Sequence, residues 1–410
     1  MNLVIYSLLL SIAVLHGSCL QTEIFYKIRQ LVHEHQHSLQ ARHDFIEQQT
    51  IEQPLDHFEP SQKTFEQRYW VNANYWKEKD HGPVFLYIGG EFPMSAGYID
   101  GGNIVDLAEQ YGGLIFGVEH RYYGLSVFEG SLENENLVYL SSQQALADLA
   151  EFCVFARKMY NLTDQNKWIA YGGSYPGSLS AWFRLKYPHL VSGAVASSAP
   201  VQAKTDFQGY NNVAAASFAS PRVGGSVQCR SNIKKAFTTV DQLIAEKNFQ
   251  KLEEDFSSCG DMSHPNDTWV FTQHLMTVLD SIVQYNNQIP GTVNIQHVCQ
   301  YMTNPSMTPY QGLVLLVQSF LALSKPCVNY NYTAYMELFE NTTQDPTGGA
   351  LYRQWIYQTC SQFGYCRVIS ILISFLFLIR TVKSPVVLPA AFYYITCKKI
   401  SDVKISDVLF

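Results

Sequence analysis

A serine lies between two glycine-containing turns in the segment GGSYPG, residues 172–177. The apolar run WIAY precedes this segment, and apolar residues at helical spacing follow it. A strand, a sharp turn and a helix in this order form a nucleophile elbow, which presents a serine hydroxyl above a sheet. The pattern predicts that Ser174 attacks a carbonyl carbon in an acyl-transfer reaction.

The elbow has the pattern G-x-S-x-G, and this chain has Pro176 at the position of the second glycine. Proline is tolerated in the first turn of a helix, because a backbone N–H there has no intrahelical partner. The oxyanion of such sites accepts a hydrogen bond from the N–H of the residue after the nucleophile, and Tyr175 retains that group. Pro176 therefore changes the motif without removing its chemistry.

A second oxyanion donor is expected from the loop after an earlier strand. The segment YIGGEF, residues 87–92, has glycines where an apolar strand ends. The backbone N–H groups of Gly90 and Glu91 are therefore the candidates. An ordinary glycine turn is the alternative interpretation of this segment.

Strand and helix patterns alternate through the first half of the chain. Strands are predicted over residues 67–76, 83–91, 114–124, 168–173 and 192–200. Helices are predicted over residues 101–113, 143–162 and 174–187. Ser141 or Ser142 is the expected N-cap of the second helix. This alternation is typical of an α/β fold with a mostly parallel sheet and helices on both faces.

The alternation stops near residue 206, and mostly helical patterns follow. We expect a signal peptide, an N-terminal or propeptide-like segment, the first part of the core, a helical cap insertion, a return to the core and an atypical tail. Their predicted bounds are 1–19, 20–50, 51–205, 206–350, 351–365 and 366–410.

Several motifs occur in order: GPVFLYIGGE, GVEHRYYGLS, LSSQQALADLAEF, WIAYGGSYPGSLSAWFRLKYPHL and RQWIYQTCSQFGY. Together they resemble the family of prolyl carboxypeptidase, dipeptidyl peptidase II and thymus-specific serine protease, and are most similar to its thymus-specific type. The resemblance runs from about residue 53, at QPLDHFEP, to residue 365.

This resemblance implies an α/β-hydrolase serine exopeptidase with a helical cap inserted after the nucleophile. Such enzymes cleave next to proline near a peptide terminus, need no cofactor and work in lysosomes or endosomes. The nucleophile corresponds to Ser174. In the family motif EHRYYG, structural roles are expected for Glu119, His120 and Arg121, and contact with the site stays open as the alternative. Carboxypeptidase and dipeptidyl peptidase preferences both stay open.

A serine nucleophile needs a base, and the base needs an orienting group. The resemblance implies an Asp and a His in motifs well after QWIYQTC, and this chain has neither motif. The histidines and aspartates that follow Ser174 lie in helical or cap-like sequence: His189, His264, His274, His297, Asp241, Asp255, Asp261 and Asp280. We therefore expect that the last core strands are missing and that this chain is inactive or nearly so.

Two other hypotheses remain. One is a truncated, secreted isoform that binds peptides without cleaving them, as a decoy. The other is an esterase or lipase, which the elbow alone permits. Turnover of proline-containing dipeptides and of short esters would distinguish these hypotheses.

The N-terminus predicts entry into the secretory pathway, with a final location in lysosomes, endosomes or the extracellular space. Residues 3–15 are an apolar run, and the small residues Gly17, Ser18 and Cys19 follow it. Four N-x-S/T sequons are candidate glycosylation sites: Asn161, Asn266, Asn331 and Asn341.

The cysteines also fit an oxidising compartment. Six of them lie in polar or loop-like sequence that suits disulfides, with the pairing left open: Cys229, Cys259, Cys299, Cys327, Cys360 and Cys366. Cys153 lies on an apolar helical face and is predicted to be a free core thiol.

The composition excludes several other classes. A net charge of −7 without a basic block argues against a nucleic-acid partner. The histidines between residues 33 and 43 have no cysteine or carboxylate cluster beside them, so no metal site is predicted. A membrane span needs about 20 apolar residues, and the apolar run at residues 368–379 is shorter. The oligomeric state stays open.

Overall fold

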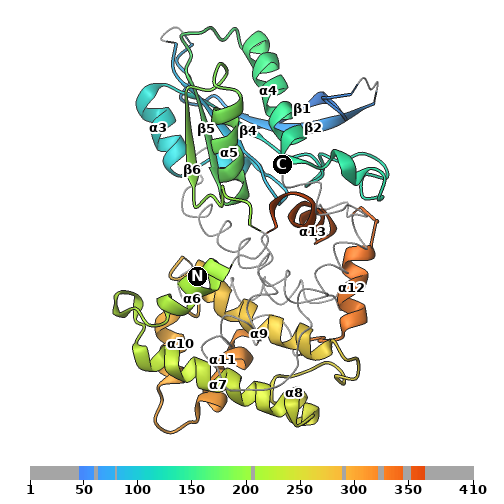
Figure 1. The fold of residues 1–410 in the computed structure, drawn as a ribbon. Helices are drawn as coiled ribbons and strands as arrows, with labels where there is room; N and C mark the ends of the chain where they lie inside the picture. The colour runs from blue at the N-terminus through green and yellow to red at the C-terminus, as the bar shows by residue number, and fades with distance from the viewer. Residues whose placement is uncertain are drawn as a thin grey trace, which may run out of the picture. The chain divides into compact units, whose positions relative to one another are not determined.

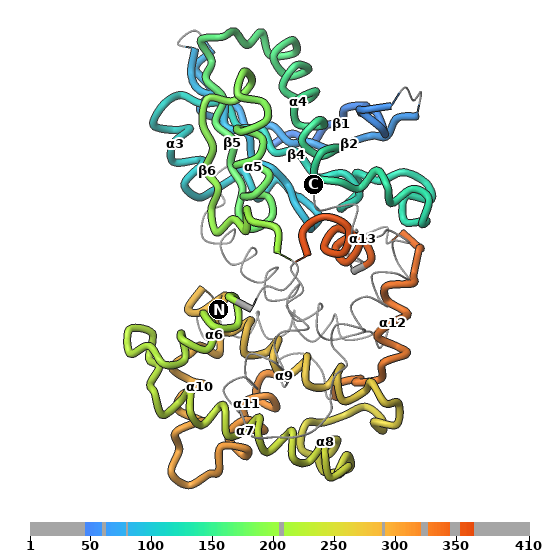
Figure 2. The backbone as a smooth tube through the Cα atoms, viewed as in Figure 1, coloured from blue at the N-terminus to red at the C-terminus, as the bar shows by residue number. Residues whose placement is uncertain are grey.

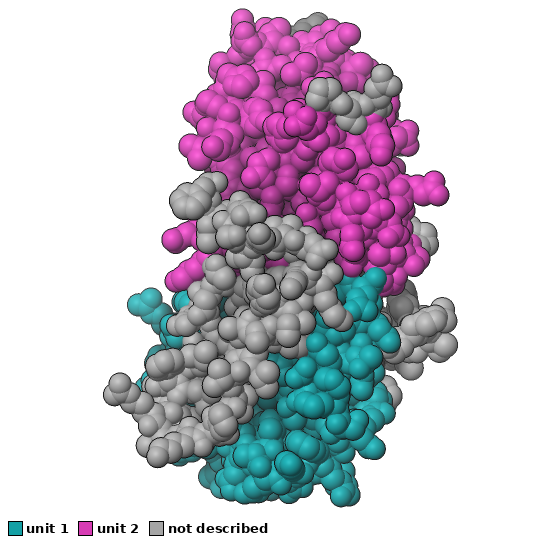
Figure 3. All heavy atoms as spheres, turned by 45° about the vertical axis from the view of Figure 1, so that its right-hand side comes forward, with its two compact units in different colours: residues 1–32, 206–340, 366–393 teal, residues 33–205, 341–365, 394–410 magenta. Residues whose placement is uncertain are grey.

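The computed structural model describes residues 46–59, 63–78, 81–204, 208–288, 292–321, 327–344 and 352–364. These residues belong to two compact units (Figure 3). We call the unit with residues 46–204 and 341–364 the sheet unit, and the unit with residues 208–340 the helical unit. The predicted signal peptide, most of the predicted 20–50 segment and the tail from residue 366 lie outside the described residues.

The sheet unit contains a six-stranded mixed sheet with the order β1-β2-β4-β3-β5-β6 (Figure 1). The strands are β1 (Glu47–Pro54), β2 (Thr64–Asn72), β3 (Val84–Ile88), β4 (Leu114–Val118), β5 (Trp168–Gly173) and β6 (Gly193–Ser197). β1 pairs with β2 and β2 with β4 in antiparallel fashion, and the other pairs are parallel. Among the described strands, β6 lies at an edge, where Val195 is 39% exposed.

Helices cover both faces of this sheet. α4 (Ser142–Met159) and α5 (Tyr175–Lys186) pack on one face through residues such as Phe152 and Leu179, which share a buried cluster with β3, β4 and β5. α3 (Asn103–Tyr111) packs on the other face through Val105 and Ala108. The expected α/β-hydrolase core with helices on both faces is confirmed.

The ends of these elements follow local rules. Ser141 caps α4 by accepting a hydrogen bond from the Gln144 N–H at 3.1 Å. Gly112 ends α3 with a φ of 64°, a conformation that favours glycine. α5 ends before Pro188, because proline cannot continue a helix.

Two strand predictions need correction. The strand predicted over residues 114–124 ends at Val118, because the EHRYYG segment turns away and its side chains make buried hydrogen bonds. β1 was not predicted, and it begins at Glu47, within the segment 20–50 that the sequence set apart from the core. Its polar residues pair with β2, so its sequence lacks a clear apolar alternation.

Among its described residues, the helical unit contains helices and one isolated bridge between Ser258 and Val328. Its α-helices are α6 (Gln208–Ser217), α7 (Val227–Ala245), α8 (Phe249–Asp255), α9 (Asp267–Gln284), α10 (Ile295–Met302), α11 (Pro309–Leu321) and α12 (Tyr332–Glu340). Helices α7 to α11 share a buried apolar cluster that includes Phe271, Leu275 and Leu313. The mostly helical character expected after residue 206 is what the described residues show.

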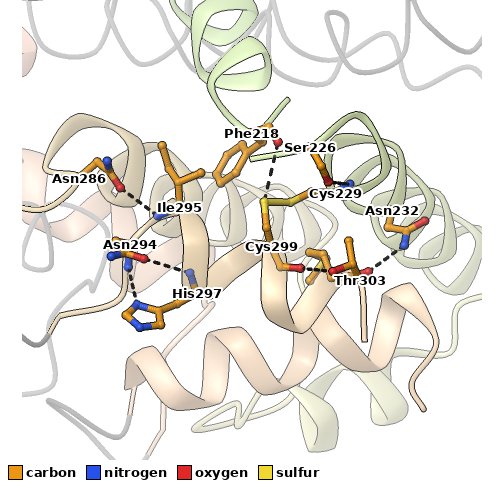
Figure 4. The surroundings of a disulfide bond; sticks show 11 residues. Phe218, Ser226, Cys229, Asn232, Asn286, Asn294, Ile295, His297, Cys299 and Thr303 are labelled. Atoms are coloured by element: carbon orange, nitrogen blue, oxygen red, sulfur yellow. Dashed lines mark hydrogen bonds between the residues drawn. A yellow bond between two sulfur atoms is a disulfide. The ribbon is translucent and has the colours of Figure 1, made fainter. Parts of the chain in front are cut away.

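Two disulfides join distant parts of the helical unit: Cys229–Cys299 and Cys259–Cys327. Figure 4 shows the first, which links α7 to α10. Cys360 is also disulfide-bonded, whereas Cys366 lies outside the described residues. Cys153 is a buried free thiol, as predicted.

The chain returns to the sheet unit through α13 (Tyr352–Gln358) and a π-helical turn (Thr359–Phe363). Phe363 joins the buried cluster beneath α5, and its carbonyl accepts a hydrogen bond from the Lys204 N–H at 2.9 Å. Figure 2 traces the chain from β5 through α5 to β6. The serine motif lies at the turn between β5 and α5. No described helix is long and apolar enough to cross a bilayer.

We predict that the Cys229–Cys299 disulfide stabilises the protein by several kcal/mol. It closes a loop with a sequence separation of 70, for which chain entropy alone gives about 4 kcal/mol. Urea denaturation of the Cys229→Ala/Cys299→Ala double variant measures the loss. Cys153→Ala is the control, because it removes a buried sulfur without a disulfide. An unchanged denaturation midpoint in the double variant would contradict the prediction.

Candidate active site

Ser174 occupies the turn between β5 and α5 in a strained backbone conformation. Its φ is 63° and its ψ is −129°, a region that residues with a Cβ rarely adopt and that costs about 1–3 kcal/mol. The Ser174 N–H donates to the Ser197 carbonyl at 2.9 Å, and its carbonyl accepts from the Ser178 N–H at 3.1 Å. The end of β6 and the first turn of α5 thus hold the serine in this conformation.

Close backbone approach explains the glycines around Ser174. A Cβ at Gly172 would lie 2.1 Å from the Pro176 carbonyl oxygen, and one at Gly177 would lie 2.8 Å from the Ser197 carbonyl oxygen. Larger residues at either position would push α5 away from β5 and β6. The small residues are therefore a requirement of the turn.

Pro176 packs directly against the other predicted oxyanion segment. A Cβ at Gly90 would lie 2.2 Å from the Pro176 Cγ, so the proline ring fills the space that this glycine leaves free. Pro176 lies in the first turn of α5, where the sequence placed it. The loop after β3, with Gly90 and Glu91, therefore contacts the turn that carries Ser174.

The Glu119 carboxylate holds the loop after β3 in place through hydrogen bonds. Its Oε1 accepts from the Met94 N–H at 2.9 Å, and its Oε2 accepts from the Ser126 N–H at 3.0 Å and the Ser126 hydroxyl at 2.7 Å. Arg68 pairs with both carboxylate oxygens, which compensates the burial of this fully buried group. Glu119 thus ties the loops after β3 and β4 together.

Arg121 and Asp148 form a buried ion pair beneath the sheet. The Arg121 Nε and Nη2 donate to the two Asp148 oxygens, each at 2.6 Å, and Nη1 donates to the Leu55 carbonyl. Burial alone would raise the pKa of Asp148, but the Arg121 charge and the hydrogen bonds from Arg121 and His57 outweigh it and lower that pKa. The pair fixes the segment after β1 against α4, so its role is structural.

His120 contacts the side chain of the residue after the nucleophile. Its Nδ1 lies 2.6 Å from the Arg121 carbonyl, which can only accept, so Nδ1 carries the proton. Its Nε2 then accepts from the Tyr175 hydroxyl at 2.9 Å. The Gln358 amide donates to the same hydroxyl at 3.0 Å, and Tyr123 donates to the Gln358 carbonyl. Burial lowers the pKa of His120 to about 4, so the ring is uncharged at neutral pH.

No histidine within the described residues forms a hydrogen bond with the Ser174 hydroxyl. His120 uses both ring nitrogens elsewhere, and the exposed His189 follows α5. His264, His274 and His297 lie in the helical unit, together with Asp241, Asp255, Asp261 and Asp280. His297 and Asn294 form a capping box at the N-terminus of α10 (Figure 4). The described part of the sheet unit therefore contains a candidate nucleophile and candidate oxyanion donors without a base.

The four sequons differ in their exposure. Asn161 and Asn341 are exposed, whereas Asn266 and Asn331 are half-buried. The Asn331 side chain accepts a hydrogen bond from the Ala334 N–H at 2.9 Å, at the start of α12. Within the described residues, no cluster of three metal-ligating side chains occurs.

The sequence predicts the turn at Ser174 and the glycine loop, but it does not reveal the side chains that hold these two segments in place. It predicts a role for the Tyr175 backbone N–H only, and it gives Gln358 no role. Tyr175 lies in GGSYPG and Gln358 in RQWIYQTC, at a sequence separation of 183, and no spacing rule joins these two motifs.

Comparisons with known proteins bear on this site. The model of the family Serine carboxypeptidase S28 matches residues 53–402, a range that extends past residue 365, where the motifs end. The human thymus-specific serine protease is 36% identical over 77% of this chain and 63% of its own length. The human lysosomal Pro-X carboxypeptidase is 32% identical over 76% of this chain and 63% of its own length. The chain thus spans less than two thirds of these relatives.

We predict that Gly90→Ala destabilises the protein by about 1–3 kcal/mol, because the added methyl group overlaps the Pro176 ring. The same change should cost clearly less in a Pro176→Ala background, where the overlapping Cγ and Cδ are absent. A double-mutant cycle on the free energy of unfolding measures this coupling. Additive effects of the two changes would contradict the contact.

We also predict that His120 makes stability depend on acidity. The pKa of His120 is about 4 in the folded chain and about 6.5 for an unperturbed histidine, so between pH 6.5 and 4 the unfolded chain binds more of this proton than the folded chain. The free energy of unfolding should therefore fall as the pH drops from 6.5 to 4, by up to about 3 kcal/mol from this group. Denaturation across this interval should show a shallower decline in His120→Gln. The exposed His189→Gln variant is the control, and equal pH slopes in all three proteins would refute the assignment.

Proposed function

The chain belongs to the Serine carboxypeptidase S28 family, and on this premise we propose that it is a serine-type exopeptidase whose nucleophile is Ser174. The observation that carries the proposal is the strained Ser174 turn between β5 and α5, with a glycine loop packed against it. A positive φ at a serine is costly, and nucleophile elbows use such a turn to present the hydroxyl.

In the proposed reaction, the Ser174 Oγ attacks the peptide carbonyl carbon and its proton passes to a base. The carbonyl oxygen becomes an oxyanion, which accepts hydrogen bonds from the Tyr175 N–H and from the loop at Gly90 and Glu91. The C–N bond then breaks, the proton goes to the leaving amine, and water hydrolyses the acyl-enzyme. The positive end of the α5 dipole further favours the oxyanion.

We propose peptides with a proline near one terminus as substrates. The name of one relative, lysosomal Pro-X carboxypeptidase, supports this choice for a family member at 32% identity. Dipeptidyl peptidase and carboxypeptidase activities both fit the site, and residues 206–350 are proposed as the cap that selects between them.

We further propose that the 410-residue chain itself hydrolyses peptides several orders of magnitude more slowly than a complete site would. Ser174 has no base among the described residues. Loss of the base leaves only binding and oxyanion stabilisation. This deficit favours one second candidate function, a non-catalytic peptide-binding protein.

A secretory location is proposed as well, in lysosomes, endosomes or outside the cell. The two complete disulfides of the helical unit support an oxidising compartment.

An assay of the purified chain on three substrate classes tests the catalytic proposal. The substrates are Xaa-Pro amides, N-blocked peptides ending in Pro-Xaa, and short esters, with Ser174→Ala as the control. We expect peptide turnover equal to that of the control. Peptide turnover that Ser174→Ala abolishes would mean that another residue serves as base. Turnover of esters alone would favour the esterase.

Glycan occupancy tests the secretory proposal. Because a glycan must project into solvent, the exposed Asn161 and Asn341 should be occupied in protein secreted from animal cells. Mass spectrometry after enzymatic deglycosylation measures each site, and Asn161→Gln/Asn341→Gln should lose two glycans. Unmodified asparagines at both positions would count against this location.

A further inference from the structure

We infer that the side chain of Tyr175 is a positioning group: hydrogen bonds from its hydroxyl to His120 and Gln358 fix the Ser174–Tyr175 peptide and thereby aim its N–H at the oxyanion. The inference rests on the proposed function, because it names what orients a donor of that site.

The phenol ring has no room to move. Tyr175 is 1% exposed, and its ring contacts His120, Trp355 and Phe363 at centroid distances of 5.4, 5.7 and 5.1 Å. Tyr175 is also the first residue of α5, directly after the strained serine. Rotation of the peptide between the two residues would therefore have to displace a ring packed on several sides.

The hydrogen-bond directions around the hydroxyl are all determined. The Arg121 carbonyl accepts from the His120 Nδ1, which leaves Nε2 to accept from the Tyr175 hydroxyl. The Tyr123 hydroxyl donates to the Gln358 carbonyl oxygen, so the Gln358 amide points its N–H at the Tyr175 oxygen. In these two bonds the Tyr175 hydroxyl donates to the His120 Nε2 and accepts from the Gln358 amide.

These partners come from distant parts of the sheet unit. His120 follows β4, and Gln358 ends α13, at a sequence separation of 183 from Tyr175. The oxyanion donor is therefore oriented only when the segment after the helical unit has folded back onto the sheet unit. Core packing alone does not require the hydroxyl, because a phenylalanine ring would fill the same space. It would, however, leave the His120 Nε2 and the Gln358 amide without this hydrogen-bond partner.

Tyr175→Phe separates positioning from packing, since it keeps the ring and the backbone N–H and removes only the hydroxyl. Tyr171→Phe is the matched control, because Tyr171 lies on β5 and its hydroxyl has no hydrogen bond in the described structure. Reaction of the 410-residue chain with a fluorophosphonate, in which the Ser174 Oγ bonds to phosphorus and fluoride leaves, reports on the site. Its phosphonyl oxygen takes the place of the oxyanion.

We expect Tyr175→Phe to lower the maximal labelling rate about 10- to 100-fold with unchanged half-saturation, and Tyr171→Phe to match the native chain. His120→Leu should slow labelling similarly, whereas His120→Gln, which keeps an acceptor, should restore most of the rate. Equal rates in Tyr175→Phe and the native chain would overturn the inference.

If the native chain is not labelled at Ser174 at all, the proposed nucleophile fails, and amide hydrogen exchange decides the inference separately. Exchange in the peptide that spans residues 172–178 should be at least about 10-fold faster in Tyr175→Phe than in Tyr171→Phe. Equal exchange in these two variants would overturn the positioning role.

Discussion

The positive φ of Ser174 is the constraint on which the rest of the sheet unit depends. A side chain with a Cβ does not adopt this conformation unless its surroundings enforce it. The enforcement comes from the Ser197 carbonyl at the end of β6 and from glycines at residues 172 and 177 that let α5 approach the sheet. The close approach of α5 to the sheet also places the Pro176 ring against Gly90. The strained backbone of Ser174 and the position of the glycine loop after β3 therefore depend on the same packing.

The EHRYYG motif supplies buried hydrogen bonds that hold the loops around Ser174 in place. Glu119, His120 and Arg121 are all buried, and each bonds to a different loop. Glu119 holds the loop after β3, Arg121 holds the segment after β1 through Asp148, and His120 reaches the residue after the nucleophile. Buried polar groups are costly when unpaired, so this motif fixes three loops in one arrangement and penalises others. The contacts of Glu119 and Arg121 hold loops in place, whereas His120 contacts the side chain of Tyr175.

Local patterns sufficed for much of the fold and part of the site. Apolar runs, the Ser141 cap and the Gly112 end gave the helices and parallel strands, because those signals act over a few residues. β1 was not predicted, since six of its eight residues are polar and its pairing with β2 decides its structure. The serine and its glycine loop could be predicted from a short motif. The link between Tyr175 and Gln358 could not, because it depends on how a segment 183 residues away packs. Disulfide pairing likewise required the fold.

The central claim is that the Ser174 turn is built to hold an oxyanion against the Tyr175 N–H. A crystal structure of the chain after prolonged reaction with a phosphonate tests it most directly. The account predicts a covalent bond on the Ser174 Oγ and a phosphonyl oxygen about 2.7–3.1 Å from the Tyr175 nitrogen. A phosphonyl oxygen directed into solvent, or an adduct on another residue, would contradict it.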